Sequence, residues 1–550
     1  MLIATFLNIL LATQVSFGSP VNYPIALAGN FGEPRPNHFH GGIDVKTDRV
    51  EGKPIFSIGD GYVSQVTVGL YGFGNAVYVC HPEGYTSVYC HLKKFTPQLT
   101  AIVRKHQYAQ RSANGAFILK PTEMPVSKGQ LIAVSGNSGS SQAPHLHLEI
   151  HDNKNWDMLD PLDFLSSHVE DKMPPQAHGF MAYPKAGEGV FNGSAQKTNY
   201  GFSSEHLTRS FTAWGKVGFG LWANDYMEAT YNHYGIRKTE LYVDGRKVYS
   251  SNVNRIPVSA NMLVNSWGDY LHYLRSNVWY LKSFVEPGNN LSILSTDNNR
   301  GIVDFCEERD YHLTYVVSDF KGNSRSYSFV VTGEKRAIPA CRNSHAMGLL
   351  KWNRSNIFQL PGCQLTVGRN MLATDISLSP RVTPQPSKLS SLYQMMPVST
   401  PLLDYARISL RVQQQVKDPS KLYIVQHWGT DRYMGGEYHH GWVTGTIRDL
   451  GVSCELAYDD EAPIIKLTSA DGWKRGTINL SVTDGKSGLA RIEGHVDNKF
   501  VLFEEVAKTS TVRCLLQKSP VKRNGKIHTL TFKAIDNRRN SRTIQAKFVY

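Results

Sequence analysis

Short runs of alternating apolar and polar residues fill the first third of the chain, and glycine turns separate them. Within residues 19–165 these runs are PIFSI, GYVSQVTVG, NAVYVC, TSVYCHL, QLIAVSG and HLHLEI. Alternation with a period of two is typical of β-strands that bury one face. We find no sustained helical period in this segment, so the pattern predicts a domain that is all-β and mostly antiparallel.

Two later segments repeat each other. GIRKTELYVDGRKVY (235–249) resembles GLARIEGHVDNKFVL (488–502), and the pattern Asp-x-x-x-Asn-Ser-Arg at Asp319 recurs at Asp536. Each of these Asp…Asn pairs lies between two alternating runs, which is the pattern of a β-hairpin turn. Short strands with frequent turns are typical of immunoglobulin- or fibronectin-type sandwiches. The β-rich segment between the two repeats is predicted to be a more divergent sandwich.

Three polar breaks divide the chain: SSHVEDKMPPQAH (166–178), GEKRAIPACRN (333–343) and YDDEAPII (458–465). Such Pro-containing stretches are typical of linkers, and 550 residues are too many for one core. The predicted fold class is therefore all-β, with a small antiparallel β domain followed by three immunoglobulin/fibronectin-like β-sandwich modules. The predicted boundaries are 19–165, 179–334, 344–457 and 462–550.

The first eighteen residues, MLIATFLNILLATQVSFG, contain no charged side chain. Their apolar stretch is too short to cross a bilayer, and the small residues at its end suit signal peptidase. We interpret residues 1–18 as a signal peptide cleaved near Gly18, with an uncleaved anchor as the alternative. No other stretch is apolar enough to span a membrane, so the expected location is the periplasm or the cell exterior. Seven cysteines are too few to form the scaffold, and their connectivity stays open.

Two His-x-His patterns raise the question of a metal site. With 20 histidines in 550 residues, about 0.7 such patterns are expected by chance, so the pattern alone is weak evidence. In HLHLEI, strand alternation places His145, His147 and Glu149 on one face and leucines on the other. Two imidazoles on the polar face of an otherwise apolar strand are poorly explained as core residues.

A catalytic zinc ion takes three protein ligands and keeps a fourth position open for water. His40 and Asp44 are separated by two glycines, which allow the chain to turn tightly around an ion. With one histidine of the pair His145/His147 they could supply the three ligands. His91, at the end of the strand in SVYCHLKKF, is a further candidate.

Five motifs occur in order through residues 25–165: His-x-x-x-Asp in HFHGGIDVKT, Gly-Asp-Gly, Tyr-x-His-Leu, Gly-Asn-x-Gly before His-Leu-His, and a closing Asp-Pro-Leu. Together they resemble the lysostaphin/LytM-type zinc metalloendopeptidase family, which has the duplicated hybrid motif peptidase domain. The resemblance implies that His40, Asp44 and His147 bind Zn²⁺ and that His145 and His91 are catalytic. His38 is then a bystander.

The resemblance implies a secreted enzyme that hydrolyses peptide cross-links of bacterial peptidoglycan. The alternative is a non-catalytic envelope module that binds the cell wall or activates an amidase, and an adhesin with a vestigial peptidase domain is a third possibility. Gln142-Ala143-Pro144 replaces the family's Thr-Gly-Pro, and a long basic insertion follows His91. We expect this insertion to lie at the rim of the groove and to affect substrate preference. The bond cleaved and the identity of the general base stay open.

The net charge of +13 is unevenly distributed. Residues 19–165 contain twelve Lys/Arg and twelve Asp/Glu, whereas residues 466–550 contain seventeen and seven, a net charge of +10. Nucleic acid is a poor partner for a secreted chain without base-stacking motifs. We therefore predict that residues 466–550 bind an anionic envelope polymer, with a solvated basic face as the alternative.

Overall fold

The computed structural model describes residues 15–340, 347–468, 470–506 and 509–550. The fold is mainly β, and the predicted fold class is confirmed: an N-terminal β domain is followed by further β-sheet domains. We name the parts the N-terminal domain (15–169), the second module (176–333), the third module (347–458) and the last module (464–550). The boundaries predicted from the sequence stay predictions.

The N-terminal domain is organised around one antiparallel sheet. The apolar residues of its strands, such as Val45, Leu146 and Leu148, are fully buried in a single core. On β13 they alternate with His145 and His147, so the opposite face of the strand is polar. The strand order is β1 (Leu27–Gly29), β4 (Ile43–Lys46), β13 (His145–Asp152), β8 (Tyr85–Cys90), β7 (Ala76–Cys80), β6 (Gly61–Val68) and β10 (Gly115–Ile118), with β11 (Pro125–Val126) beside β6 and β14 (Met158–Leu159) beside β13.

The remaining elements of this domain cover the core or extend the loops. The helix α1 (Pro97–Gln110) corrects the expectation that this segment contains no helix. Thr96 caps its N-terminus and Pro97 begins it, but the buried face holds only Leu99, Val103 and Gln107, too few apolar residues for a helical period. The other elements are β5 (Pro54–Phe56), β12 (Leu131–Val134) and β9 (Lys94–Phe95) in one sheet, β2 (Pro34–Arg35) with β3 (His38–Phe39), α2 (Leu162–Leu165) and η1 (Ser166–His168).

The segment assigned to the signal peptide lies partly outside the described residues, since the description begins at residue 15. Phe17 belongs to the core of the N-terminal domain, where its ring is 2% exposed and contacts His81, Tyr85 and Phe164. A mature chain that began after Gly18 would lack this ring. The signal peptide and its cleavage near Gly18 both stay predictions.

The second module is one ten-stranded sheet instead of two separate sheets, because β17 and β25 pair in parallel and join its halves. Phe180 and Phe329 stack at 4.1 Å in its aromatic core. Its strands are β15 (Gln176–Phe191), β16 (Thr198–Gly201), β17 (His206–Asn224), β18 (Lys238–Val243), β19 (Arg246–Asn252), β21 (Leu281–Lys282), β22 (Leu294–Thr296), β23 (Val303–Phe305), β24 (Asp310–Ser318) and β25 (Ser324–Gly333).

A helical segment inside the second module packs on the N-terminal domain. It contains η2 (Val258–Leu263), α3 (Val264–Trp267) and α4 (Tyr270–Ser276). Just before it, β20 (Arg255–Ile256) pairs with β14. Phe31 and Phe39 of the N-terminal domain share a buried cluster with Ile256 and Trp267. The first two parts are thus joined by backbone pairing and a common core.

The third and last modules are two-sheet sandwiches, each around its own apolar cluster. Five strands form each sheet of the third module and four form each sheet of the last. The third module contains β27 (Asn356–Leu360), β28 (Cys363–Val367), β32 (Pro401–Arg411), β36 (Trp442–Asp449) and β35 (Glu437–His439), opposite β30 (Arg381–Thr383), β31 (Leu392–Gln394), β37 (Ser453–Tyr458), β33 (Leu422–Trp428) and β34 (Thr430–Tyr433), with the separate pair β26 (Gly348–Leu350) and β29 (Ile376–Leu378) and the turn η3 (Pro419–Lys421). The last module contains β38 (Ile464–Leu467), β39 (Thr477–Thr483), β43 (Thr511–Leu515) and β42 (Glu504–Glu505), opposite β41 (Lys499–Val501), β40 (Leu489–Val496), β44 (Ile527–Asp536) and β45 (Ser541–Val549), with η4 (Ala470–Arg475) and η5 (Leu516–Lys518).

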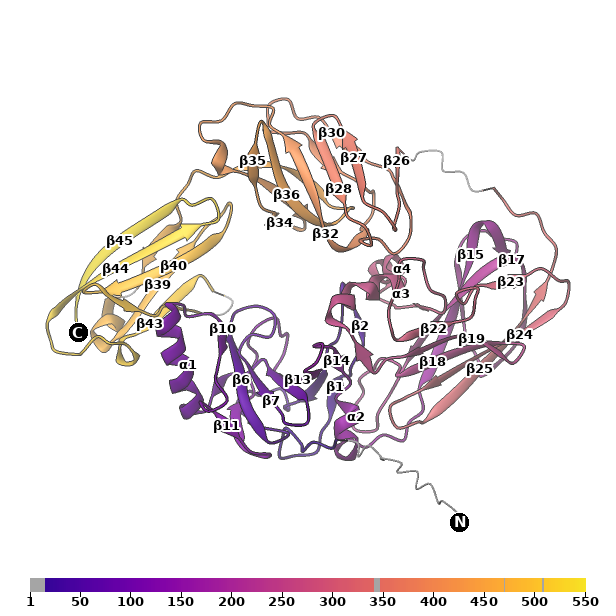
Figure 1. Ribbon diagram of the computed structural model, residues 1–550, viewed down its shortest axis with the longest axis horizontal. Helices are drawn as coiled ribbons and strands as arrows, with labels where there is room; N and C mark the ends of the chain where they lie inside the picture. The colour runs from indigo at the N-terminus through magenta and orange to yellow at the C-terminus, as the bar shows by residue number, and fades with distance from the viewer. Residues whose placement is uncertain (1–14, 341–346, 469, 507–508) are drawn as a thin grey trace, which may run out of the picture.

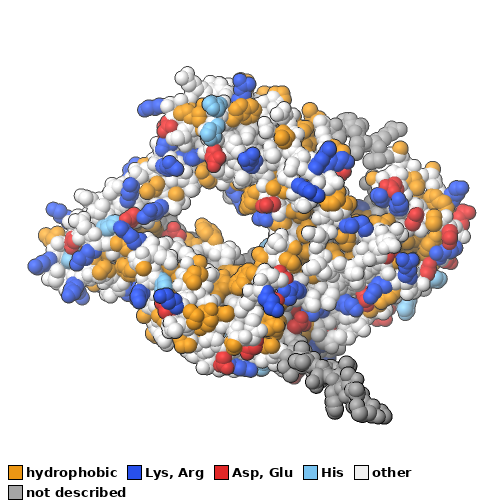
Figure 2. Space-filling model, in the orientation of Figure 1, with side chains coloured by type: hydrophobic (Ala, Val, Ile, Leu, Met, Phe, Trp, Pro, Cys, Tyr) orange, Lys and Arg blue, Asp and Glu red, His pale blue; other side chains and the backbone are white. Residues whose placement is uncertain are grey.

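The four parts form a closed ring around an opening (Figures 1 and 2). The ring closes where α1 meets the last module. There Arg104 pairs with Glu504 at 2.7 Å, Arg111 pairs with Glu493 at 2.9 Å, and the ring of Tyr108 contacts Phe500. The basic insertion after His91 therefore binds an acidic edge of the last module.

We expect reversal of both charges, Arg104→Glu with Arg111→Glu, to open the ring, because each ion pair becomes a repulsion. Small-angle scattering should then give a larger radius of gyration than for the wild type. Adding Glu493→Lys and Glu504→Lys should restore the compact particle, and Lys105→Glu on the exposed face of α1 should have no effect. Identical scattering from all variants would refute this role of the ion pairs.

No helix among the described residues has the length and apolar character needed to cross a membrane. The described cysteines are all free, and Cys341, considered as a partner of Cys363, lies outside the described residues.

Candidate metal centre and active site

Two adjacent strands bring the predicted ligands together. Asp44 of β4 lies directly opposite His147 of β13 in the antiparallel register, and both side chains point away from the apolar core. His40 approaches from the loop before β4. Gly41 and Gly42 permit this approach, since a Cβ at Gly41 would lie 2.4 Å from an oxygen of Glu149 and one at Gly42 2.1 Å from a backbone oxygen of β13. Neither glycine has a positive φ, so close packing and not backbone freedom requires them.

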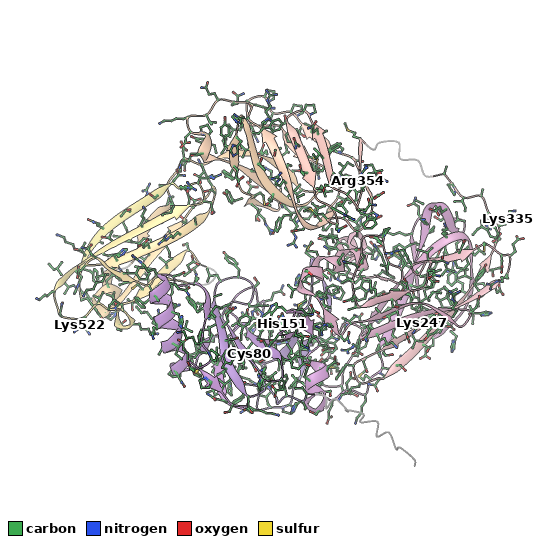
Figure 3. The ribbon with its side chains drawn as sticks, viewed as in Figure 1. Cys80, His151, Lys247, Lys335, Arg354 and Lys522 are labelled. Carbon is green, nitrogen blue, oxygen red and sulfur yellow. The ribbon has the colours of Figure 1, made fainter. Side chains whose placement is uncertain are left out.

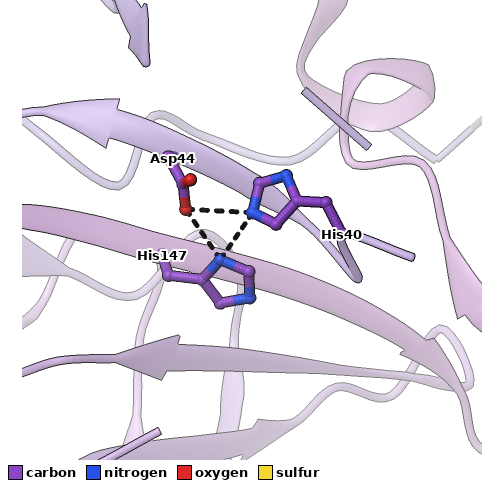
Figure 4. A group of neighbouring side chains, drawn as sticks. All are labelled: His40, Asp44 and His147. Atoms are coloured by element: carbon purple, nitrogen blue, oxygen red, sulfur yellow. Dashed lines mark hydrogen bonds and ion pairs between the residues drawn. The ribbon is translucent and has the colours of Figure 1, made fainter. Parts of the chain in front are cut away.

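Three ligand atoms converge at this point (Figure 4). His40 Nε2 lies 3.0 Å from Asp44 Oδ1 and 3.0 Å from His147 Nδ1, and the last two atoms are 2.8 Å apart. In tetrahedral zinc sites with ligand bonds of about 2.0–2.2 Å, neighbouring ligand atoms are separated by roughly 3.3–3.6 Å. The three atoms are close enough to form one face of such a tetrahedron after a small expansion. His40, Asp44 and His147 could therefore hold a metal ion.

The outer nitrogen of each histidine ligand has its own partner. His40 Nδ1 lies 2.6 Å from the carbonyl oxygen of Asn30, and His147 Nε2 lies 2.9 Å from a carboxylate oxygen of Glu149. Both partners accept hydrogen bonds, so each ring can keep a proton on its outer nitrogen when the inner nitrogen gives up its own proton to bind a metal. Such outer contacts fix the tautomer and the orientation of metal ligands.

Asp44 is ionised in this environment. Burial disfavours its charge, but the positive charge of His40 and the hydrogen bonds from His145, His147 and His40 hold the pKa of Asp44 well below its usual range. Its second oxygen, Oδ2, accepts a hydrogen bond from Arg35 at 3.1 Å. One oxygen of the carboxylate is thus held by Arg35 while the other faces the metal position.

The two predicted catalytic histidines lie beside the three ligands. The rings of His91 and His145 are 4.9 Å apart, and His145 Nε2 is 3.3 Å from Asp44 Oδ1. His91 Nδ1 donates to the carbonyl of Ser138, and His145 Nδ1 donates to that of Ala143, both at 2.8 Å. This leaves His91 Nε2 for chemistry, whereas His145 Nε2 also faces Asp44. The structure brings all five predicted site residues together, and their roles stay predictions.

The charge state of His91 follows from its surroundings. Burial, with the nearby charges of His147 and His145, lowers the pKa of His91 to about 4. At neutral pH the ring is therefore uncharged and carries a lone pair on Nε2.

His38 is exposed and its Nδ1 bonds the carbonyl of Pro36, away from the three ligand atoms.

The sequence analysis did not identify a buried chain of hydrogen bonds behind the ligands, which runs from His147 through Glu149 to His151. We call this chain the relay. Glu149 accepts hydrogen bonds from His147 at 2.9 Å and from His151 at 2.6 Å, and its side chain is 3% exposed. Figure 3 labels His151 in the N-terminal domain. The alternation of HLHLEIHD was a usable signal, because it places His145, His147, Glu149 and His151 on one face of β13. The contribution of Arg35 had no comparable signal, since it depends on the β2–β3 hairpin.

Proton competition should make metal binding depend on pH. Burial lowers the pKa of His147, but hydrogen bonds with Asp44 and Glu149 outweigh burial and raise it to about 9 in the metal-free protein. Because a proton on Nδ1 must leave before the metal binds, we expect zinc affinity to rise about tenfold per pH unit up to about pH 9. Competition titrations with a zinc-binding dye between pH 6 and pH 9 would measure this slope. A flat profile would contradict it.

The ligands lie in a cleft of about 1420 Å³ between the N-terminal domain and the second module. Residues from the segments 35–49, 72–73 and 140–145 form one part of its wall. The second module contributes Asn232, Val258, Asn261 and Tyr273 to the other. None of the described lining residues belongs to the insertion 97–122, so the expectation that this insertion forms the rim is wrong. Its helix packs on the core and contacts the last module instead.

Comparison with known protein families identifies the type of domain that contains this site. The profile of peptidase family M23 matches residues 38–115, which contain His40, Asp44 and His91. The chain contains an M23 peptidase domain. The predicted resemblance is confirmed at this level. A second profile, the Zu5-like domain, matches residues 347–459, which cover the third module.

Three known proteins are similar to part of this chain. An uncharacterized metalloprotease of Haemophilus influenzae is 32% identical over 147 residues, which cover 26% of this chain and 24% of that protein. Peptidoglycan DD-endopeptidase ShyA of Vibrio cholerae is 31% identical over 138 residues, covering 24% and 26%. The catalytic domain of lysostaphin from Staphylococcus simulans is 23% identical, covering 26% of this chain and 92% of that structure, with a TM-score of 0.20. The chain thus spans about a quarter of the length of these two curated relatives.

Proposed function

We propose that this protein is a secreted zinc metalloendopeptidase that hydrolyses peptide cross-links of bacterial peptidoglycan. The convergence of His40 Nε2, Asp44 Oδ1 and His147 Nδ1 within 3.0 Å of one another carries the proposal. Membership of the M23 family and the relative named as a peptidoglycan endopeptidase support the substrate class.

The donor set fits zinc. Two imidazole nitrogens and one carboxylate oxygen are ligands that catalytic zinc sites use, and each imidazole has a hydrogen-bond acceptor on its other nitrogen. The three residues also line the cleft, so a fourth position would be accessible to water and substrate. When bound there, zinc polarises a scissile carbonyl and lowers the pKa of water to about 7.

The chain supplies the proton transfers and the orientation. His145 and His91 are fixed through Nδ1, so each offers Nε2 to the cleft. We assign to His145 the removal of a proton from the attacking water and to His91 the stabilisation of the developing oxyanion. In this assignment His91 is uncharged when free, so the proton it needs would be the one that His145 takes from the water, and this proton would finally pass to the leaving amine. Arg35 holds the outer oxygen of Asp44 and keeps the inner oxygen in place.

Within the peptidoglycan substrates, we favour D-Ala–diaminopimelate cross-links over glycyl-glycine bridges. The stem peptides around the former carry free carboxylates, whereas glycine bridges have no charged side chain. Lys46 and Arg49 line the cleft beside the ligands, where they can attract such carboxylates. Digestion of defined muropeptides of both kinds, followed by mass identification of the products, tests the proposal. Cleavage of glycine bridges alone would refute the preference.

Metal content separates the enzyme from its non-catalytic alternatives. We expect about one zinc ion per purified chain at the M23 site and turnover of cross-linked muropeptides. A protein that binds the wall or activates an amidase without turnover would overturn the enzymatic proposal. The proposed location is the periplasm or the cell exterior, and fractionation of cells with immunodetection would test it.

We also propose that the last module binds an anionic envelope polymer. Figure 3 shows Lys522 on the outer side of the ring, and Lys522, Arg523 and Lys526 are exposed. We expect wild-type protein to bind isolated envelope with an affinity that falls steeply with salt, because 0.1 M salt screens exposed charges within about 10 Å.

Neutralising Lys522, Arg523 and Lys526 to glutamine should weaken this binding severalfold in co-sedimentation. The same charge change at Lys185, Arg246 and Lys335, which are exposed in the second module and just after it, is the control. Equal loss in both variants would indicate a non-specific charge effect. Binding that ignores salt would exclude an electrostatic partner.

A further inference from the structure

A cluster of three carboxylates lies where the N-terminal domain continues into the second module. It joins Asp171, Asp225 and Asp319, which can each place an oxygen within 4.8 Å of the others. The three residues are 6%, 1% and 4% exposed. Each comes from a different segment: the linker, the end of β17 and the turn between β24 and β25. Tertiary folding, and not one acidic stretch of sequence, brings them together.

Two oxygens of this cluster are buried and have no hydrogen-bond partner: Oδ2 of Asp171 and Oδ1 of Asp225. The nearby cation, Lys321, donates instead to the carbonyl of Ser166 at 2.6 Å. Burial and the charges of its neighbours raise the pKa of Asp171 to about 7 and that of Asp225 to about 8. Buried carboxylates at such short distances repel each other, and free buried oxygens are costly. A cation between these carboxylates would offset their repulsion and give the two free oxygens a partner.

The last module contains a second cluster of the same kind. Asp459, Asp484 and Asp536 also place oxygens within 4.8 Å of one another. Asp459 belongs to the linker before this module, Asp484 follows β39, and Asp536 ends β44. Beside them, the buried hydroxyl of Ser487 has no hydrogen-bond partner, and the Ser487 amide donates to Asp459 at 3.1 Å.

The two clusters share the contacts of their linker aspartates and turn aspartates. Asn323 donates to Oδ2 of Asp319 at 2.7 Å and to the carbonyl of Asp171 at 3.3 Å. Asn540 likewise donates to Asp536 at 2.7 Å and to the carbonyl of Asp459 at 2.9 Å. Oδ1 of each linker aspartate accepts from the amide two residues later, at 3.0 and 3.1 Å. The repeated modules therefore preserve the arrangement of the carboxylates as well as the strands.

We propose that each cluster binds one Ca²⁺ ion. Calcium takes six to eight oxygen ligands at about 2.3–2.6 Å in flexible geometry, and carboxylates from separate segments suit it. Neither cluster contains a histidine or cysteine that would favour zinc. Magnesium demands near-ideal octahedral geometry and keeps several waters, which suits such buried clusters less well.

The ions would attach each linker to the module that follows it. Asp171 and Asp459 lie in linkers, whereas the other two ligands of each site belong to the sandwich. Calcium binding would thus restrict how the N-terminal domain meets the second module and how the third module meets the last. Restriction at these two joints favours the closed ring in which α1 contacts the last module.

Calcium titration of the full-length, zinc-loaded protein tests the proposal. We expect isothermal calorimetry to give two Ca²⁺ per chain with dissociation constants below about 1 mM, and much weaker binding of Mg²⁺. Asp225→Asn and Asp484→Asn should each remove one equivalent, and the double variant should bind none. Calcium should raise the unfolding midpoint of the wild type by at least about 4 °C and that of the double variant not at all.

The control is Asp244→Asn with Asp497→Asn, which removes the same charge at exposed, repeat-related turns and should keep both equivalents. The cluster variants should fold without calcium, because each loses one of three repelling charges. Fewer than two equivalents in the wild type at 10 mM Ca²⁺, on the order of ten times the weakest affinity of extracellular calcium modules, would overturn the proposal. Binding that persists in the double variant would overturn it as well.

Discussion

His147→Ala should abolish zinc binding and peptidase activity together. His147 Nδ1 is one of the three converging ligand atoms, and it lies 2.8 Å from Asp44 Oδ1 and 3.0 Å from His40 Nε2. With two ligands left, zinc affinity should fall by several orders of magnitude, and kcat/KM should drop at least about 10⁴-fold. Metal analysis of the purified variant and muropeptide turnover measure the two effects on the same sample.

Two further histidine variants test whether the loss of zinc is specific to His147. His145→Ala should retain about one zinc ion while kcat falls about 10²–10⁴-fold, because it removes a proton-transfer group and not a ligand. His38→Ala changes the exposed member of the other His-x-His pair and should leave both zinc and activity unchanged. Zinc lost from His145→Ala but kept by His147→Ala would reverse the assignment within the pair.

The strands and the pair His40 and Asp44 were accessible from the sequence because both depend on short-range patterns, whereas the choice of His147 over His145 came only from the family resemblance. The alternation in HLHLEI predicts β13 and the common face of His145, His147 and Glu149. The spacing of His40 and Asp44 needs only one turn of chain. Pairing of β13 with β4 then places Asp44 beside His147, which the family resemblance implied before the register was known.

Long-range packing was not accessible in the same way. The wall of the cleft contributed by Asn261 and Tyr273 comes from a helical segment more than two hundred residues after His40. The insertion after His91 was expected at the groove because it follows a catalytic strand. Its two arginines instead pair with Glu493 and Glu504, almost four hundred residues away, and no local pattern indicates such partners.

Glu149→Gln should weaken zinc binding about 10–100-fold, although Glu149 does not contact the metal position. Its carboxylate accepts hydrogen bonds from His147 Nε2 and His151 Nε2 in a fully buried setting. An amide has one acceptor oxygen where the carboxylate has two, and it loses the negative charge that makes His147 a stronger donor to the metal. Chelator-competition titration at fixed pH would measure the change in dissociation constant.

Glu83→Gln, in the exposed turn between β7 and β8, is the matched control and should bind zinc like the wild type. Glu149→Ala removes both acceptors and should lower zinc affinity further than the glutamine variant, because the Nε2 atoms of His147 and His151 then lose their buried partner. A lower unfolding midpoint with unchanged zinc affinity in both variants would show that Glu149 supports only the fold. Unchanged zinc affinity and stability would refute the relay altogether. The expected order of zinc affinity, wild type above glutamine above alanine, follows from the hydrogen bonds that each side chain can accept from His147.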